Sequence, residues 1–138
     1  MGTLGMLTRD WQVAAAYSYQ HGVLTQTLSS SAQSGAVLAQ LPRHTFSIWN
    51  RYDVSRMWAA GVGVIRRGDM FASTDNTVTV PASLRVDAAV FATLSPRLRA
   101  QVNLENAFDA HYFASAQNNF NITPGAPRAV RVTLTTRF

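Results

Sequence analysis

The sequence predicts an all-β chain, an antiparallel up-and-down meander of about six strands. Three observations lead to this prediction. Apolar and polar residues alternate with a period of two in several segments, which is typical of strands whose two faces meet different surroundings. The connections between these segments are alternately short and long. Aromatic residues gather near both ends of the apolar strand faces.

The alternation is clear in the last third of the chain. In residues 97–105 the apolar face is Leu98, Ala100, Val102 and Leu104, and the polar face is Arg97, Arg99, Gln101, Asn103 and Glu105. The final segment opposes Val130, Val132, Leu134 and Phe138 to Arg131, Thr133, Thr135 and Arg137. Most domain ends are loose and polar. We therefore expect the end at Phe138 to be fixed or recognised.

Four earlier segments also read as strands: residues 11–20, 44–52, 57–67 and 83–94. Residues 3–7 read as the tail of another strand. Trp49 interrupts the apolar–polar alternation of its segment. Gly61 and Gly63 occupy alternate positions on one face, where they weaken a strand but leave room for a bulky group.

The connections indicate how these strands are arranged. Turns near residues 8–10, 53–56 and 95–96 are short, whereas the links at 21–43, 68–82 and 106–127 are long. A meander places all the long links at one end. Short turns at one end and long loops at the other are typical of outer-membrane barrels.

Aromatic residues on the apolar faces fall into two groups. Trp11, Tyr52, Trp58 and Phe138 belong to the short-turn end, and Tyr17, Tyr19 and Phe46 to the long-loop end. Two such girdles around an aliphatic band are expected at the two interfaces of a bilayer. In a soluble β-protein, aromatic residues more often gather mid-strand. The placement therefore favours a membrane β-sheet.

The composition limits which other classes of protein the chain can belong to. The chain has 138 residues, 47% hydrophobic residues, no cysteine and a net charge of +5, which fits one domain or a piece of one. No run approaches the roughly 18 apolar residues of a spanning helix, and residues 1–10 do not read as a signal peptide. The arginines lie mostly opposite the aromatic residues, so we expect no nucleic-acid partner.

Motifs for catalysis or metal binding are not found in the sequence. His21, His44 and His111 are far apart and lack ligand spacing. We therefore expect no enzymatic activity, metal site or cofactor. Asp87 and Glu105 could face each other as a carboxylate pair, although arginines nearby favour an ion-pair network on the polar face.

The third long connection is the candidate ligand-binding segment. Its aromatic and amide side chains suit a flat or aromatic solute, and the candidates are His111, Tyr112, Phe113, Gln117, Asn118 and Phe120. Asn119 and Asn121 extend the amide group. The alternative is that Tyr112 and Phe113 simply pack the connection against the sheet.

Several motifs together resemble the TonB-dependent outer-membrane receptors. Residues 106–109 (NAFD) followed by Tyr112 resemble the N-L-F-D-x-x-Y motif near their C-terminus, and residues 124–128 (PGAPR) before a strand ending in Phe138 are similar to the close of their siderophore branch. Residues 41–49 resemble P-R-H-x-x-x-L-W, and residues 11–19 resemble W-x-L-x-x-x-Y-x-Y. Ala107 and Thr136 depart from the usual Leu and aromatic residue.

The resemblance implies a transmembrane β-barrel of about 22 strands with an N-terminal plug, located in the cell outer membrane. Such a receptor binds and imports ferric siderophore with energy from TonB. Residues 1–138 are then expected to be the C-terminal part of the β-barrel domain, without the plug and the first strands. Six strands with two open edges leave backbone groups that lipid cannot satisfy, so the fragment alone is not expected to transport.

The resemblance also implies partners and residue roles. The expected partners are outer-membrane lipid, ferric siderophore, the plug and remaining barrel strands, TonB through the plug, and the barrel-assembly machinery through the C-terminus. The lumen- or plug-facing residues are then Arg85, Asp87, Arg99, Gln101, Asn103 and Glu105. The motif and assembly-signal residues are Asn106, Phe108, Asp109, Tyr112, Pro124, Gly125, Pro127, Arg128 and Phe138.

The alternative function is a stand-alone small β-barrel or β-sheet protein that binds a ligand. Such a chain would have to close on itself, and small barrels need about eight strands.

Overall fold

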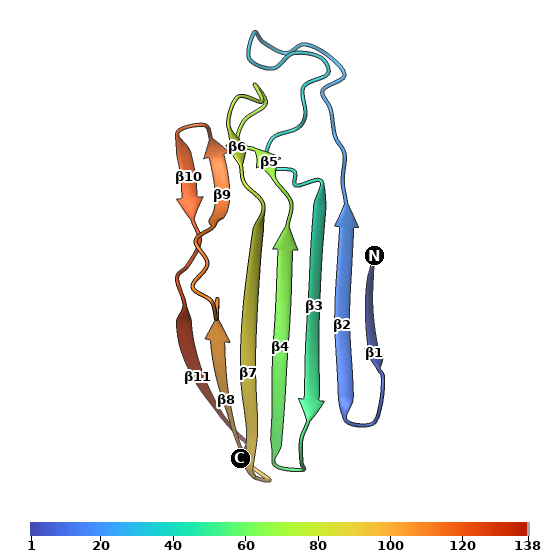
Figure 1. Ribbon diagram of the computed structural model, residues 1–138, viewed down its shortest axis with the longest axis vertical. Helices are drawn as coiled ribbons and strands as arrows, with labels where there is room; N and C mark the ends of the chain where they lie inside the picture. The colour runs from blue at the N-terminus through green and yellow to red at the C-terminus, as the bar shows by residue number, and fades with distance from the viewer. Residues whose placement is uncertain (138) are drawn as a thin grey trace.

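A computed structural model describes residues 1–137, and Phe138, with its expected role in assembly, lies outside the described residues. The main element is one antiparallel sheet of seven strands, in the order β1-β2-β3-β4-β7-β8-β11 (Figure 1). The strands are β1 (Gly2–Met6), β2 (Trp11–Tyr19), β3 (His44–Asp53), β4 (Trp58–Arg67), β7 (Ser83–Ser95), β8 (Leu98–Glu105) and β11 (Ala129–Thr136). The predicted meander is confirmed, and the expected strand tail is the five-residue strand β1, which pairs with β2.

Two short hairpins lie within the long connections, where the sequence predicted only loops. β5 (Met70–Phe71) pairs with β6 (Thr79–Val80), and β9 (Phe113–Asn118) pairs with β10 (Asn121–Pro124). Both hairpins lie beyond the same end of the main sheet, at the top of Figure 1. These strands have two to six residues. The longest, β9 (FASAQN), does not alternate strictly between apolar and polar residues, so a period-two pattern does not reveal it.

The strand register sorts the side chains of the sheet into two faces. Arg51 pairs with Gly61, Gly61 with Ala89, and Ala89 with Asn103, so these residues share what we call the polar face. The apolar face holds the aliphatic and aromatic residues predicted to share it, with Tyr17 beside Phe46 and Trp11 beside Tyr52. The edge strand β1 departs from the pattern, because its Leu4 lies opposite Ala14 on the polar face.

Trp49 pairs with Gly63 and lies on the polar face of β3. As an apolar residue on that face it interrupts the apolar–polar alternation, as the sequence predicts. Its indole ring lies across Gly61 and Gly63 of the next strand (β4). A Cβ atom added at Gly61 would lie 2.6 Å from the Cζ2 atom of Trp49. The two glycines therefore supply the space that the sequence suggested, and the indole ring fills it.

Neither face of the sheet is covered by a second layer within residues 1–137. Most large apolar side chains on the apolar face are widely exposed; Val62, Val90 and Val132 are 49%, 47% and 64% exposed. A stable sheet must bury its apolar face against something. No helix in the described part of the chain is long and apolar enough to cross a bilayer.

Substituting Gly63 tests the packing under Trp49. Gly63→Ala places a methyl group into the space of the indole ring, and overpacking of this kind costs about 1–3 kcal/mol of folding free energy. Gly5→Ala is the matched control, because a Cβ at Gly5 has no neighbouring atom within 4 Å. Urea unfolding of the detergent-solubilised protein, followed by tryptophan fluorescence, measures both. Equal unfolding midpoints for the two variants would contradict this packing.

Candidate functional site

The three long connections pack together at one end of the sheet, and we call residues 20–43, 68–82 and 106–128 the loop layer. The buried apolar cluster of the described chain lies in this layer. Met70, Ala72, Val80 and Ala116 form it, with Val78 and Ile122 packed against them. The cluster joins the β5–β6 hairpin to the β9–β10 hairpin, so the second and third connections form one packed unit.

Side-chain amides tie the connections to one another. The amide nitrogen of Val37 donates to Oδ1 of Asn76 at 2.8 Å, and Nδ2 of Asn76 donates to the carbonyl of Val37 at 2.9 Å. Nδ2 of Asn119 donates to Oδ2 of Asp75 at 2.7 Å and to the Thr77 hydroxyl at 3.0 Å. The first connection is thereby held to the second, and the second to the third.

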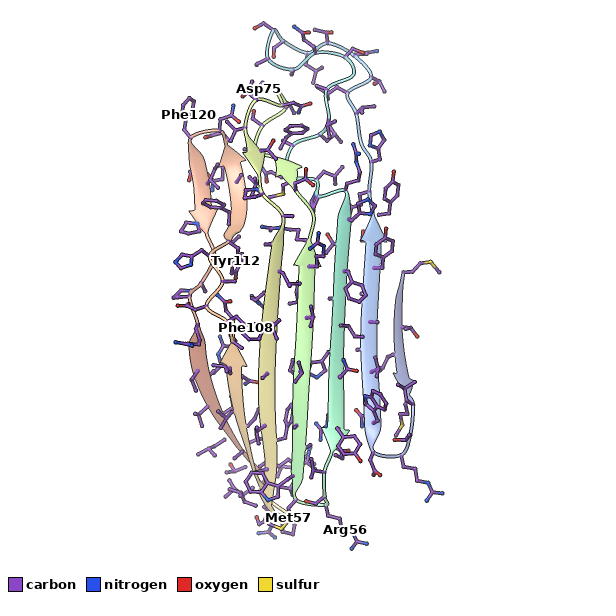
Figure 2. The ribbon with its side chains drawn as sticks, viewed as in Figure 1. Arg56, Met57, Asp75, Phe108, Tyr112 and Phe120 are labelled. Carbon is purple, nitrogen blue, oxygen red and sulfur yellow. The ribbon has the colours of Figure 1, made fainter. Side chains whose placement is uncertain are left out.

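Asp75 is held in its charged form by these contacts. The backbone N–H of Thr77 donates to the carboxylate and is the main reason that the pKa of Asp75 lies below its ordinary value. The Thr77 hydroxyl and the Asn119 amide lower it further. Asp75, which Figure 2 labels in the loop layer, therefore stays ionised across neutral and mildly acidic pH and remains an acceptor for Asn119.

Arg67 anchors the β9–β10 hairpin to the main sheet. It ends β4 on the polar face, and its guanidinium donates to the carbonyls of Phe113 and Ala114, the latter at 2.6 Å. Neither Arg67 nor Asp75 and Asn76 stood out in the sequence. The Asp-Asn pair is a turn signal in the middle of a connection, but only the fold places it against Val37 and Asn119.

The NAFD motif makes the buried joint between β8 and the third connection. Asn106 is 2% exposed and has a left-handed backbone, with φ at +51°. Its Nδ2 donates to the carbonyls of Ala110 and Ala126, and its Oδ1 accepts from the amide of Ala110 at 2.9 Å. Asn is one of the few residues that adopt this conformation readily, and its amide group closes the loop on itself.

The rest of the motif closes the other side of the same loop. Oδ1 of Asp109 accepts from the backbone amide of Arg128 at 2.8 Å. The amide of Gly125 donates to the carbonyl of Tyr112 at 2.7 Å. The ring of Tyr112 covers Gly125 so closely that a Cβ atom there would lie within it. The motif residues that are distant in sequence therefore meet at the neck of the third connection, where Figure 2 shows Tyr112.

Asp87 and Arg85 of β7 connect this neck to the polar face. Nη2 of Arg85 lies 2.8 Å from Oδ2 of Asp87, and its Nη1 donates to the Tyr112 hydroxyl at 3.3 Å. Oδ1 of Asp87 accepts from the backbone amide of Asn106 at 2.8 Å. These contacts hold the third connection against the polar face.

The other residues expected to face the lumen continue along the same face. Nε2 of Gln101 donates to Oδ1 of Asn103 at 2.7 Å, and Glu105 pairs with Arg131 at 3.2 Å. Asp87 and Glu105 therefore pair with Arg85 and Arg131 rather than with each other, and Arg51 and Asp53 form a third ion pair on the same face at 3.0 Å. Arg99 makes no ion pair with any residue in 1–137. A hollow of about 340 Å³ is lined by Trp49 and by the residues of the Arg85–Asp87 and Glu105–Arg131 pairs.

The six candidate ligand residues fall into two groups: three make contacts within the third connection or at its neck, and three have exposed rings. Tyr112 is engaged at the neck. Oδ1 of Asn118 accepts from the backbone amides of Phe120 and Asn121, both at 2.9 Å, and Oε1 of Gln117 accepts from the side chain of Asn121. The rings of His111, Phe113 and Phe120 are exposed.

Phe120 is the most prominent of these candidates, because it is 100% exposed at the tip of the β9–β10 hairpin (Figure 2). Phe108 of the NAFD motif is also 79% exposed. Residues 1–137 contain no group of three or more His, Cys, Asp or Glu side chains that could hold a metal ion. The exposed surface offers aromatic rings and amides.

Comparison with known proteins identifies relatives along almost the whole chain. Residues 4–107 match the family "TonB dependent receptor-like, beta-barrel". The catecholate siderophore receptor Fiu of Escherichia coli K12 is 27% identical over 97% of this chain and 18% of its own length. The metal-pseudopaline receptor CntO of Pseudomonas aeruginosa is 28% identical over 97% of this chain and 19% of its own. The chain thus spans about a fifth of the length of the curated relatives it matches.

Solved structures agree with the sequence relatives. The ferric-catecholate import receptor Fiu of E. coli K12, in its closed form, superposes with a TM-score of 0.85 and 26% identity, over 98% of this chain and 20% of that one. The siderophore receptor PiuA of Acinetobacter baumannii gives 0.82 at 24% identity, over 99% of this chain and 21% of that one. The seven-stranded sheet and its loop layer therefore match a continuous part of larger receptors.

Asn106 offers a direct test of the neck. Asn106→Ala removes the partner of the half-buried amide and carbonyl groups of Ala110 and of the carbonyl of Ala126, which we expect to lower the free energy of unfolding by about 2 kcal/mol. Asn121→Ala, at an exposed site, should change it by at most about 0.5 kcal/mol. Urea unfolding and proteolysis of the 106–128 segment measure the effect. An Asn106→Ala variant as stable and as protease-resistant as Asn121→Ala would contradict the structural role.

Proposed function

Because the chain belongs to the TonB-dependent receptor β-barrel family, we propose that it forms part of an outer-membrane receptor that binds and imports ferric siderophore with energy from TonB. The observation that carries the proposal is the two-faced sheet with its packed loop layer, which superposes over 98% of its length on a ferric-catecholate import receptor. The relatives named above are receptors rather than enzymes.

The two faces of the sheet receive different roles in this proposal. The exposed aliphatic side chains of the apolar face meet membrane lipid, with the aromatic residues at its two margins. The polar face lines the lumen. Its ion pairs, together with Arg99 and the Gln101–Asn103 pair, meet the plug of the complete receptor.

The loop layer is the proposed capture surface. Phe120, Phe113 and His111 present exposed rings on the hairpin and its base, while the neck holds that hairpin in place. Aromatic rings stack on other planar groups in offset or edge-on arrangements. The relative Fiu is named as a receptor for catecholates, and catecholate siderophores carry such planar groups. We therefore propose catecholate siderophores as the ligand class of this chain.

Further strands are required for this function. Within residues 1–137, β1 pairs only with β2 and β11 only with β8, so each leaves one edge unpaired. Lipid cannot satisfy such edges. A chain that closed on itself as a small barrel would pair β1 with β11, and these strands do not pair. We therefore propose that residues 1–138 act with a plug and other strands, and that alone they do not transport.

A chimeric receptor tests this function. Residues 1–138 replace the matching fifth of the E. coli receptor Fiu in a strain that lacks its own catecholate receptors. We expect growth on a ferric catecholate as the only iron source in the strain with TonB, and none in the otherwise identical strain without it. Phe120→Ala in the chimera should weaken ligand binding without altering assembly, because its ring makes no packing contact that supports the barrel.

Assembly of the chimera is checked by its heat-modifiable migration on gels. A chimera that assembles fully but gives neither binding nor TonB-dependent growth would refute the proposed function.

A further inference from the structure

One arginine, Arg66, lies on the apolar face, whereas the other charged residues in the strands of the main sheet lie on the polar face. Within the strands of the main sheet, the charged residues are Arg51, Asp53, Arg66, Arg67, Arg85, Asp87, Arg99, Glu105 and Arg131. The register places all of them on the polar face except Arg66. Arg66 lies beside Phe46 on β3 and Leu84 on β7, on the apolar face and at its loop-layer end.

The neighbours of Arg66 form a compact aromatic group. Tyr17 pairs with Phe46, and Tyr19 pairs with His44 in the next row toward the loop layer. The hydroxyl of Tyr17 lies 2.8 Å from Nδ1 of His44. The ring centres of Tyr19 and His44 are 5.1 Å apart. We call Tyr17, Tyr19, His44, Phe46 and Arg66 the rim cluster.

The rim cluster carries an uncompensated positive charge. Arg66 is exposed, and it makes no ion pair or side-chain hydrogen bond with any residue in 1–137. No carboxylate lies on the apolar face of the described strands. A charge facing lipid costs about 2–4 kcal/mol at the midplane of the bilayer and about 0–1 kcal/mol near its interfaces. Arg66 lies at the end of the apolar face, near the interface, where the cost of facing lipid is small.

Interfacial depth is also where lipid phosphate groups are found. A guanidinium binds phosphate through two parallel hydrogen bonds and is more weakly hydrated than an ammonium group. Tyr19 adds a hydroxyl. When the Tyr17 hydroxyl donates to Nδ1 of His44, the proton of that imidazole is on Nε2, which becomes a further donor. The cluster thus combines one fixed charge with neutral donors around an apolar base.

We propose that the rim cluster is a binding site for the phosphate group of a lipid headgroup in the outer leaflet. Arg66 binds the phosphate oxygens, the donors of Tyr19 and His44 complete the site, and the Phe46 ring packs against the first carbons of the lipid. This inference rests on the membrane placement given under the proposed function, but not on the identity of the siderophore. The occupant is a lipid because the site lies on the face that meets lipid.

The experiment uses the chimeric receptor, extracted from outer membranes and exchanged into nanodiscs of neutral lipid with a trace of fluorescent phosphorylated glycolipid. Retention of that lipid is compared with retention of its dephosphorylated form. We expect Arg66→Gln to lower the affinity for the phosphorylated lipid about tenfold, as loss of a charge-assisted pair predicts. Arg66→Lys should retain part of it. Arg56→Gln is the matched control, because Arg56 is exposed on a turn at the opposite end of the sheet (Figure 2).

Three results would overturn the proposal: wild-type affinity in Arg66→Gln, an equal loss in Arg56→Gln, or equal retention of the dephosphorylated lipid. Displacement of the lipid by millimolar inorganic phosphate would also overturn it and identify a site for a soluble anion instead. Carbonate extraction of the membranes reports insertion separately. If Arg66→Gln inserts, supports TonB-dependent growth and retains the lipid as well as the wild type does, the lipid site at the rim cluster is contradicted. The proposed function then remains intact.

Discussion

The hydrogen-bonding demand of the strand backbone governs this structure. In lipid, an N–H or C=O group has no solvent partner, so a spanning strand must be paired along both edges. The five inner strands of the main sheet meet this demand with antiparallel neighbours on each side. β1 and β11 meet it on one side only. These two open edges are the reason that the proposed function needs further strands.

Side-chain burial is concentrated outside the sheet for the same reason. A sheet between lipid and lumen needs little core of its own, and its buried apolar side chains are small, as at Ala59 and Ala89. The closely packed groups lie in the loop layer at one end of the sheet. There the Met70 cluster, the hydrogen bonds of Asn119 with Asp75 and of Asn76 with Val37, and the neck around Asn106 hold the three connections together. The loop layer is therefore a fixed unit, and these contacts hold the hairpin that carries its exposed rings.

Much of the fold could be predicted from the sequence, because in a strand between two different environments the type of each residue indicates which environment its side chain faces. The faces of β7 and β8 follow their alternation up to the irregularity between Thr93 and Ser95 at the turn end. The sequence predicts that Trp49 interrupts the alternation, but not that its indole ring lies across Gly61 and Gly63. The hairpin strands of the loop layer are short, and the longest of them, β9, does not alternate strictly. Contacts such as Asn76 with Val37 join residues 39 positions apart, and no local pattern encodes them.

The candidate site was predictable to a lesser degree. The motif at residues 106–112 and 124–128 indicated which residues matter, but not that Tyr112 lies over Gly125 and receives a hydrogen bond from Arg85. Those roles depend on β7 and β8 being neighbours. The placement of Arg66 became visible only from the register, because in the sequence it is one of two consecutive arginines at a strand end.

The two faces of the sheet are proposed to meet lipid and water. Residues 1–138 contain no cysteine, so a single introduced cysteine is the only one in this part of the chimera, and the chimera without it gives the background labelling. Val132 and Thr133 are adjacent in β11, similar in shape, and on opposite faces. In outer membranes carrying the chimeric receptor, a water-soluble maleimide should label Thr133→Cys readily and Val132→Cys hardly at all. Equal labelling of both, or labelling of Val132→Cys alone, would contradict the account.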